Sequence, residues 1–142
     1  MKYCYSAKSL LIYFIYFCKT QRINFDGMVS KRHADLQVCP NGREVGGCTY
    51  FEFKSVRKVP PPNFDEQFAK DLLIDEVTNL NQLKCIFDGK KIPEGYDFKG
   101  KMKKAIEKMD IPKEALKKFG KESVDELKND IIKNFDNIFQ VK

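Results

Sequence analysis

The stretch ADLQVCPNGREVGGCTYFEFKSV, residues 34–56, decides how the first part of this chain folds. Both of its ends alternate apolar and polar side chains with a period of two residues, which is typical of β-strands. A loop rich in Pro and Gly separates the two runs, so the stretch predicts an antiparallel hairpin. The polar side chains of each strand share one face: Asp35 and Gln37 on the first, and Tyr50, Glu52 and Lys54 on the second.

The pattern changes after the prolines at 60–62, which prevent further strand pairing. Apolar residues then recur at helical spacing, and we expect a helix from Phe64 to about Lys84. A further strand is expected at about 84–87. Residues 96–142 predict a helical tail, with helices starting near Phe98, at Pro112 and at a capping box formed by Ser123 and Glu126. The predicted class is α+β: a small sheet flanked by helices, in a single domain spanning 1–142.

Basic residues outnumber acidic ones by 26 to 20, which gives a net charge of +6. The whole surplus lies in residues 1–60, with 10 Lys or Arg and 4 Asp or Glu, whereas residues 61–142 carry 16 of each. A basic field concentrates polyanions such as nucleic acid near a protein. A merely soluble basic surface has the same composition, so charge alone leaves both interpretations open.

Cys39 and Cys48 flank the loop of the predicted hairpin. A disulfide between them fits a secreted protein, but we favour two buried free thiols. The apolar segment Leu10–Cys18 is far shorter than the roughly 20 residues that cross a bilayer as a helix. We interpret this segment as a buried strand or helix within an irregular or degenerate stretch 1–30, and expect no stable membrane insertion. A degenerate export or membrane-associated segment is the alternative.

Asp35, Glu52 and Lys54 are predicted to project together, because alternate residues of a strand share a face and the two strands are neighbours. Two carboxylates are suitable ligands for Mg²⁺, which keeps several waters. A bound metal activates a phosphoryl group and a water, and a lysine stabilises the charge that develops. The alternative without a catalytic role is an exposed cross-strand charge pattern on a solvated sheet face.

His33-Ala34-Asp35-Leu36 followed by Tyr50-Phe51-Glu52-Phe53-Lys54-Ser55 resembles the PD-(D/E)xK motif of the restriction-endonuclease-like nucleases, with Ala34 in place of the usual Pro. Gln67 matches a Gln that several branches place on the following helix. Over residues 31–88 the chain is similar to the nuclease domains of bacterial polymorphic toxins. The acid that some members carry on an earlier helix has no clear counterpart, since residues 1–30 offer only Asp26.

The resemblance implies a restriction-endonuclease-like core and a nuclease that hydrolyses phosphodiester bonds with Mg²⁺ or Mn²⁺. Its metal ligands would be Asp35 and Glu52, and its catalytic residues would be these two with Lys54 and Gln67. DNA is expected ahead of RNA as substrate. The resemblance further implies a toxin effector that is secreted or delivered into a target cell, acts in the cytoplasm, and has a cognate immunity protein as partner.

Four residues near the motif are predicted to contact substrate: Arg32, His33, Arg57 and Lys58. A solvated basic patch is the alternative for the cations, and a strand-edge hydrogen bond is the alternative for His33. Tyr50 is suited to stack on a base, but we favour a surface cross-strand aromatic. Two other functions remain open: a non-catalytic nucleic-acid-binding module and a protein-interaction domain.

Overall fold

The computed structural model describes the backbone of residues 5–8, 14–17, 21–25, 28–32 and 35–142, and the side chains from residue 35 onward except that of Arg43. Its strands are β1 (Tyr5–Lys8), β2 (Phe14–Phe17), β3 (Gln21–Phe25), β4 (Met28–Arg32), β5 (Leu36–Cys39), β6 (Thr49–Lys54), β7 (Leu83–Phe87) and β8 (Phe139–Val141). Its helices are α1 (Phe64–Leu72), α2 (Phe98–Lys108), α3 (Lys113–Lys118), α4 (Val124–Lys133) and α5 (Phe135–Ile138), with single 3₁₀ turns at Arg43–Val45 and Leu80–Gln82.

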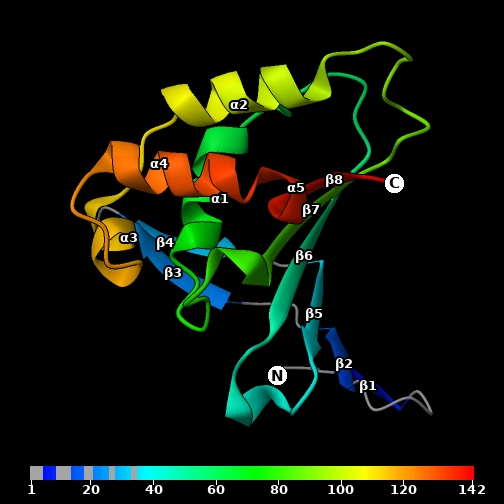
Figure 1. Cartoon of the computed structure of the whole chain (residues 1–142). Helices are drawn as coiled ribbons and strands as arrows, with labels where there is room; N and C mark the ends of the chain where they lie inside the picture. Colours follow the sequence, from blue (N-terminus) through cyan, green and yellow to red (C-terminus); the bar gives the residue numbers. More distant parts are fainter. Residues whose placement is uncertain (1–4, 9–13, 18–20, 26–27, 33–34) are drawn as a thin grey trace.

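The main sheet has six strands in the described part of the chain, in the order β1-β2-β5-β6-β7-β8. Within this sheet β1, β2, β5 and β6 pair antiparallel, whereas β6, β7 and β8 run parallel. Strands β3 and β4 form a separate hairpin. The helices gather on one side of the β5–β8 part of the sheet (Figure 1). The predicted α+β class is confirmed, with the hairpin of β5 and β6 and the further strand β7 where the sequence placed them.

The helix-covered side of the β5–β6 hairpin is its polar side. Gln37 and Tyr50 are buried there and joined by a hydrogen bond of 3.0 Å from the Gln37 amide to the Tyr50 hydroxyl. The apolar residues on the opposite side are more accessible, and Phe53 is 52% exposed. Tyr50 is therefore not the surface aromatic that the sequence suggested, because helix packing buries its face of the strand.

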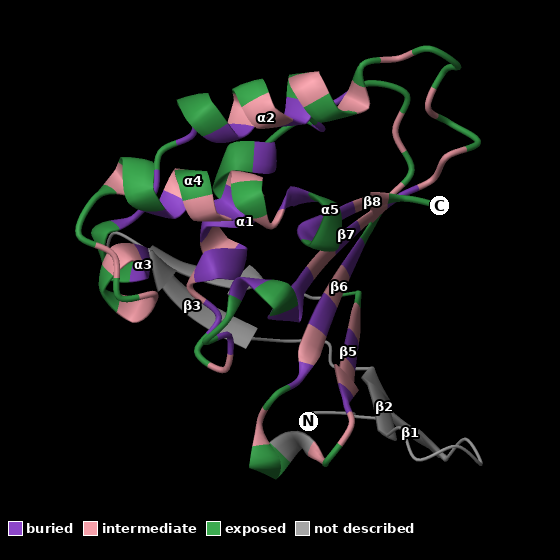
Figure 2. Cartoon of the chain, viewed as in Figure 1, coloured by how far each residue is buried: buried purple, intermediate pink, exposed green. Residues whose placement is uncertain are grey.

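Aromatic side chains from distant parts of the chain meet in the core between sheet and helices. Phe68 of α1 lies 5.5 Å from Phe64 and 5.2 Å from Phe139 of β8, measured between ring centroids. Phe139 is in turn 5.1 Å from Phe135 of α5. Buried residues accordingly line the facing sides of helices and strands (Figure 2). The C-terminal segment is thus part of the core that supports α1.

Two predicted element boundaries are wrong. The helix that begins at Phe64 ends at Leu72 instead of continuing to about Lys84. The chain then turns, and the capping box of Asn79 and Gln82 starts the 3₁₀ turn that leads into β7. At the other end the last predicted helix breaks after Lys133, and residues 139–141 form β8 beside β7.

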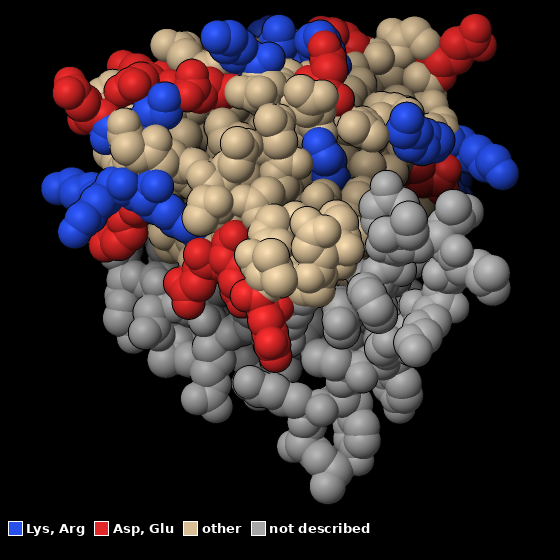
Figure 3. Space-filling view, turned by 60° about the horizontal axis from the view of Figure 1, so that its bottom comes forward, with Lys and Arg blue, Asp and Glu red and all other residues tan. Residues whose placement is uncertain are grey.

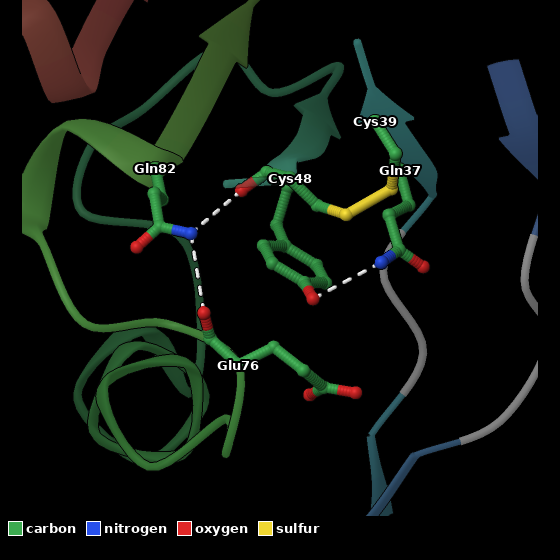
Figure 4. The surroundings of a disulfide bond; sticks show 6 residues. Gln37, Cys39, Cys48, Glu76 and Gln82 are labelled. Atoms are coloured by element: carbon green, nitrogen blue, oxygen red, sulfur yellow. Dashed lines mark hydrogen bonds between the residues drawn. A yellow bond between two sulfur atoms is a disulfide. The ribbon is translucent and has the colours of Figure 1, made fainter. Parts of the chain in front are cut away.

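The loop between β5 and β6 is closed by a disulfide between Cys39 and Cys48, so the prediction of two free thiols is wrong (Figure 4). Both cysteines are buried. The neighbouring backbone is held from the other side, because the Gln82 side-chain amide donates to the Cys48 carbonyl at 2.9 Å and to the Glu76 carbonyl at 3.1 Å. The disulfide therefore fixes the hairpin whose open ends carry Asp35 and Glu52.

Replacing both Cys39 and Cys48 with alanine is expected to lower the free energy of unfolding by about 2–3 kcal/mol, because a cross-link over a loop of this length restricts the unfolded chain. Urea denaturation of the double variant against the oxidised wild type measures the loss. Peptide mapping after alkylation of the native protein is the control for the cross-link, and alkylation at both positions would contradict it.

Parts of the N-terminal predictions fall on described residues. Phe14–Phe17 form β2, in agreement with a strand in the segment Leu10–Cys18, whereas residues 10–13 and 18 lie outside the described part. Within the stretch 1–30, expected to be irregular, the described residues form strands. In the described parts of the chain, none of the helices has the length and apolar character needed to cross a bilayer.

Candidate active site

The β5–β6 register places Asp35 opposite Glu52. Leu36 pairs with Phe51 and Gln37 with Tyr50 in this antiparallel ladder, so continuing it by one residue brings Asp35 and Glu52 together. Residues directly opposite each other in an antiparallel pair point to the same face of the sheet. Asp35, which directly precedes β5, therefore lies level with Glu52 at the end of the hairpin.

The Asp35 side chain is anchored on β6. The Asp35 backbone amide donates to the Phe51 carbonyl at 3.1 Å, and the side-chain Oδ2 accepts a hydrogen bond from the Phe53 backbone amide at 2.7 Å. Because the Phe53 amide lies between Glu52 and Lys54 in the chain, this bond holds the Asp35 carboxylate beside both residues. Asp35 remains exposed to solvent, so the site is open on this side.

Glu52 and Lys54 occupy the helix-covered face of β6. Glu52 is only 7% exposed. The Lys54 Nζ lies 3.5 Å from Glu52 Oε2, and the Lys54 side chain is 18% exposed. A carboxylate is rarely buried unless a cation or hydrogen-bond donors compensate it. The alternative without a catalytic role, an exposed charge pattern on a solvated sheet face, is therefore contradicted at Glu52.

Gln67 completes the arrangement from the first helix. Phe64 and Phe68 turn toward the core, and Gln67, which precedes Phe68, faces β6. Its Oε1 accepts a hydrogen bond from Lys54 Nζ at 2.8 Å. The ammonium of Lys54 is thus held between an amide oxygen and a carboxylate, so its position is set by two elements. The four predicted catalytic residues come from β6, α1 and the start of β5.

The predicted substrate-binding residues are less well placed. Arg57 and Lys58 are exposed in the segment that leads from β6 to α1. Arg32 ends β4 and its backbone pairs with Gln21, but its side chain lies outside the described part. His33 also lies outside the described residues. Their contact with substrate stays a prediction.

The donor set fits a cation that keeps part of its water. Asp35 has one carboxylate oxygen engaged by the Phe53 amide, and Glu52 supplies the second carboxylate. Mg²⁺ commonly uses one or two protein carboxylates together with waters. Among the described residues no group of three or more His, Cys, Asp or Glu could hold a metal ion. Asp35 and Glu52 offer carboxylate oxygens, the donor type that Mg²⁺ and Mn²⁺ prefer.

The surface charge of the described part is mixed. In the view of Figure 3, Lys and Arg form separate groups around an uncharged area, and Asp and Glu form groups of their own. The basic surplus of the sequence lies in residues 1–60, most of which have no described side chains. The prediction of a basic field around the site therefore rests on the sequence.

The chain was compared with protein-family models, with curated proteins and with solved structures. No family model, curated protein or solved structure matches it.

One exposed residue of the region was not singled out from the sequence. Phe53 reads as an ordinary apolar position of an alternating strand, yet its ring faces solvent and stacks on Phe51, with 6.4 Å between centroids and 11° between planes. The alternation predicts which residues share a face of the strand. Which of the two faces the helices cover depends on residues distant in sequence.

Proposed function

We propose that this chain is a metal-dependent nuclease that hydrolyses phosphodiester bonds, with DNA expected ahead of RNA. The observation that carries the proposal is the Lys54 ammonium held 2.8 Å from Gln67 Oε1 and 3.5 Å from Glu52 Oε2, beside a second carboxylate on the neighbouring strand. A frequent Glu-x-Lys tripeptide on a solvated strand would not require a helix residue to position its lysine.

Each residue has a role that follows from its surroundings. Asp35 and Glu52 would hold Mg²⁺ or Mn²⁺, which when bound supplies Lewis-acid activation of the phosphoryl group and of the attacking water. Lys54 donates to the oxygen on which negative charge develops, and its partial burial strengthens that interaction. Gln67 positions Lys54 and thereby fixes the direction of the donated hydrogen bond.

The elements around these residues support the resemblance to the PD-(D/E)xK nucleases. Asp35 directly precedes β5 of the hairpin, and Glu52 and Lys54 lie on β6. A helix bearing Gln67 follows, and a further strand lies beside β6. We extend the proposal to a restriction-endonuclease-like core and to the polymorphic-toxin branch. A toxin effector would be secreted or delivered, act in the cytoplasm of the target cell, and be neutralised by a cognate, acidic immunity protein. The Cys39–Cys48 disulfide suits a chain that passes through an oxidising compartment.

Metal removal tests the proposal. The protein is incubated with plasmid DNA and, separately, with total RNA in Mg²⁺, and the same reactions are run with EDTA. We expect cleavage with Mg²⁺ or Mn²⁺, complete loss in EDTA, and recovery when Mg²⁺ is added in excess. Glu52→Gln, purified identically, is expected to be inactive and excludes a contaminating nuclease, whereas Glu66→Gln, on the exposed side of α1, should cleave as wild type.

The second candidate is a non-catalytic nucleic-acid-binding module, which the exposed Phe53 ring would suit. Retention of DNA or RNA without cleavage, unchanged by Glu52→Gln and by EDTA, would establish it and overturn the nuclease. Cleavage that persists in EDTA would contradict the metal-dependent mechanism.

A further inference from the structure

The exposed ring of Phe53 forms one wall of a pocket at the end of β6 and β7. The pocket has a volume of about 290 Å³ and is lined by Phe53, Lys54, Ser55, Ile86, Phe87, Asp88 and Lys142. The parallel register places Ile86 beside Phe53, so an aliphatic and an aromatic side chain form the apolar side of the pocket. Pockets for drug-sized ligands start at roughly 300 Å³. The space therefore suits one flat heterocycle.

The ring of Phe53 is positioned to stack on the aromatic ring of a ligand. The side chain of Phe51 already stacks on Phe53, which restricts the orientation of the phenyl group. More than half of Phe53 is exposed, so its ring is accessible to a stacking partner. An aromatic ring presented in this way is a platform on which nucleobases of any identity stack.

The charges around the pocket suit a nucleic acid that inserts a base, rather than a phosphate, into the pocket. Lys142 lines the pocket, and the exposed Lys90 and Lys91 follow Asp88 in the adjoining turn. The backbone of Lys142 is fixed by hydrogen bonds to the Phe87 carbonyl at 3.0 Å and from the Gly89 amide at 2.7 Å. Asp88 would repel a phosphate inside the pocket, but a carboxylate accepts hydrogen bonds from the amino groups of bases.

The pocket adjoins the candidate active site. Asp35 Oδ2 accepts the Phe53 amide at 2.7 Å, and the residues on either side of Phe53 are Glu52 and Lys54. The Phe53 ring points to the opposite sheet face from Glu52, because successive side chains of a strand alternate. Both faces are nearest to each other at the end of β6, where Ser55 follows the strand and lines the pocket.

We propose that this pocket binds an unpaired nucleobase, stacked on Phe53, next to the phosphodiester that the active site cleaves. The inference rests on the proposed nuclease function and narrows its substrate to single-stranded DNA or RNA, or to single-stranded regions. A base within a duplex is already stacked on both sides and paired, so it has to leave the helix before it can enter. The exposed Phe53 and the size of the pocket therefore disfavour an intact duplex as the bound form.

Binding is measured with labelled 12-nucleotide single strands of DNA and of RNA and with a DNA duplex, by fluorescence anisotropy in EDTA so that nothing is cleaved. We expect single strands to bind more tightly than the duplex. Phe53→Ala should weaken single-strand binding by about 5- to 150-fold, the range for losing one base–aromatic stack. Phe53→Tyr should restore it, and Val45→Ala, which truncates an exposed apolar side chain in the β5–β6 loop, should bind as wild type.

A second readout locates the base directly, because the chain has no Trp. Phe53→Trp and Val45→Trp each introduce a single fluorophore. Quenching by the single strand in the first variant but not in the second would support stacking at residue 53. Wild-type affinity of Phe53→Ala, or equal binding of duplex and single strand without quenching, would overturn the pocket even if the enzyme cleaves. Quenching and tight binding without any cleavage in Mg²⁺ would retain the pocket and remove the nuclease.

Discussion

Replacing Lys54 with methionine is expected to lower the rate of phosphodiester cleavage by about 10²- to 10³-fold, the usual cost of removing one preorganised donor to developing charge. The Nζ of Lys54 is held by Gln67 and Glu52, so the wild-type enzyme does not have to reorganise it during the reaction. Methionine keeps a long flexible side chain but has no charge and no donor. Initial rates on plasmid DNA and on single-stranded oligonucleotides, at saturating Mg²⁺, measure the loss.

Lys99→Met is the matched control, because Lys99 also pairs with a carboxylate, that of Asp136, but lies on α2. Its cleavage rate should equal that of the wild type. Lys54→Arg retains the charge but replaces a compact ammonium by a planar fork, so an intermediate rate is expected. Circular dichroism and thermal unfolding of each variant exclude loss of the fold. A folded Lys54→Met protein that cleaves at the wild-type rate would remove Lys54 from the mechanism.

Local patterns were sufficient for the elements that carry the candidate site. The alternation of residues 34–38 and 48–54 and the Gly-rich loop between them predict a hairpin without knowledge of the rest of the chain. That hairpin sets Asp35 opposite Glu52 and places Lys54 on the same face. Gln67 could be placed as well, because the spacing of Phe64 and Phe68 defines the helix phase and therefore the residues beside them.

Which face of the hairpin is buried could not be predicted in the same way. An alternating strand usually turns its apolar side to the core, yet here Gln37, Tyr50 and Glu52 are buried and Phe53 is exposed. Which face is buried depends on helices that follow later in the chain, and on whether their side chains form hydrogen bonds or ion pairs with the polar groups of the strands. Gln67 does so for Lys54, which is a contact over 13 residues that no local pattern contains.

Long-range contacts also determine the two element boundaries for which the prediction from the sequence is wrong. The end of α1 is stabilised by Lys118 of α3, whose ammonium donates to the carbonyls of Leu72 and Ile74. These carbonyls belong to the last turn and the exit of the helix, where partners within the helix run out. Strand β8 likewise exists because β7 offers a parallel edge to it more than 50 residues away. Neither partner is visible in a window of neighbouring residues.

Phe68→Ala is expected to lower the free energy of unfolding by about 3–5 kcal/mol, as for other large aromatic residues that are removed from a core. Phe68 is 1% exposed and packs between Phe64 and Phe139, so alanine leaves a cavity at the contact of α1 with β8. Domains are stable by only about 5–15 kcal/mol, so this loss is a large fraction of the total. Because α1 also carries Gln67, cleavage activity should be lost at a correspondingly lower temperature.

Urea denaturation gives the change in free energy, and activity after incubation at rising temperatures gives its consequence for the site. Phe53→Ala is the matched control, since it removes the same side chain from an exposed position and should change the free energy of unfolding far less than Phe68→Ala. Equal destabilisation by the two substitutions would contradict the assignment of the core to the α1 side of the sheet. Equally large losses would mean that the Phe53 side of the hairpin is packed as well, contrary to the 52% exposure of Phe53.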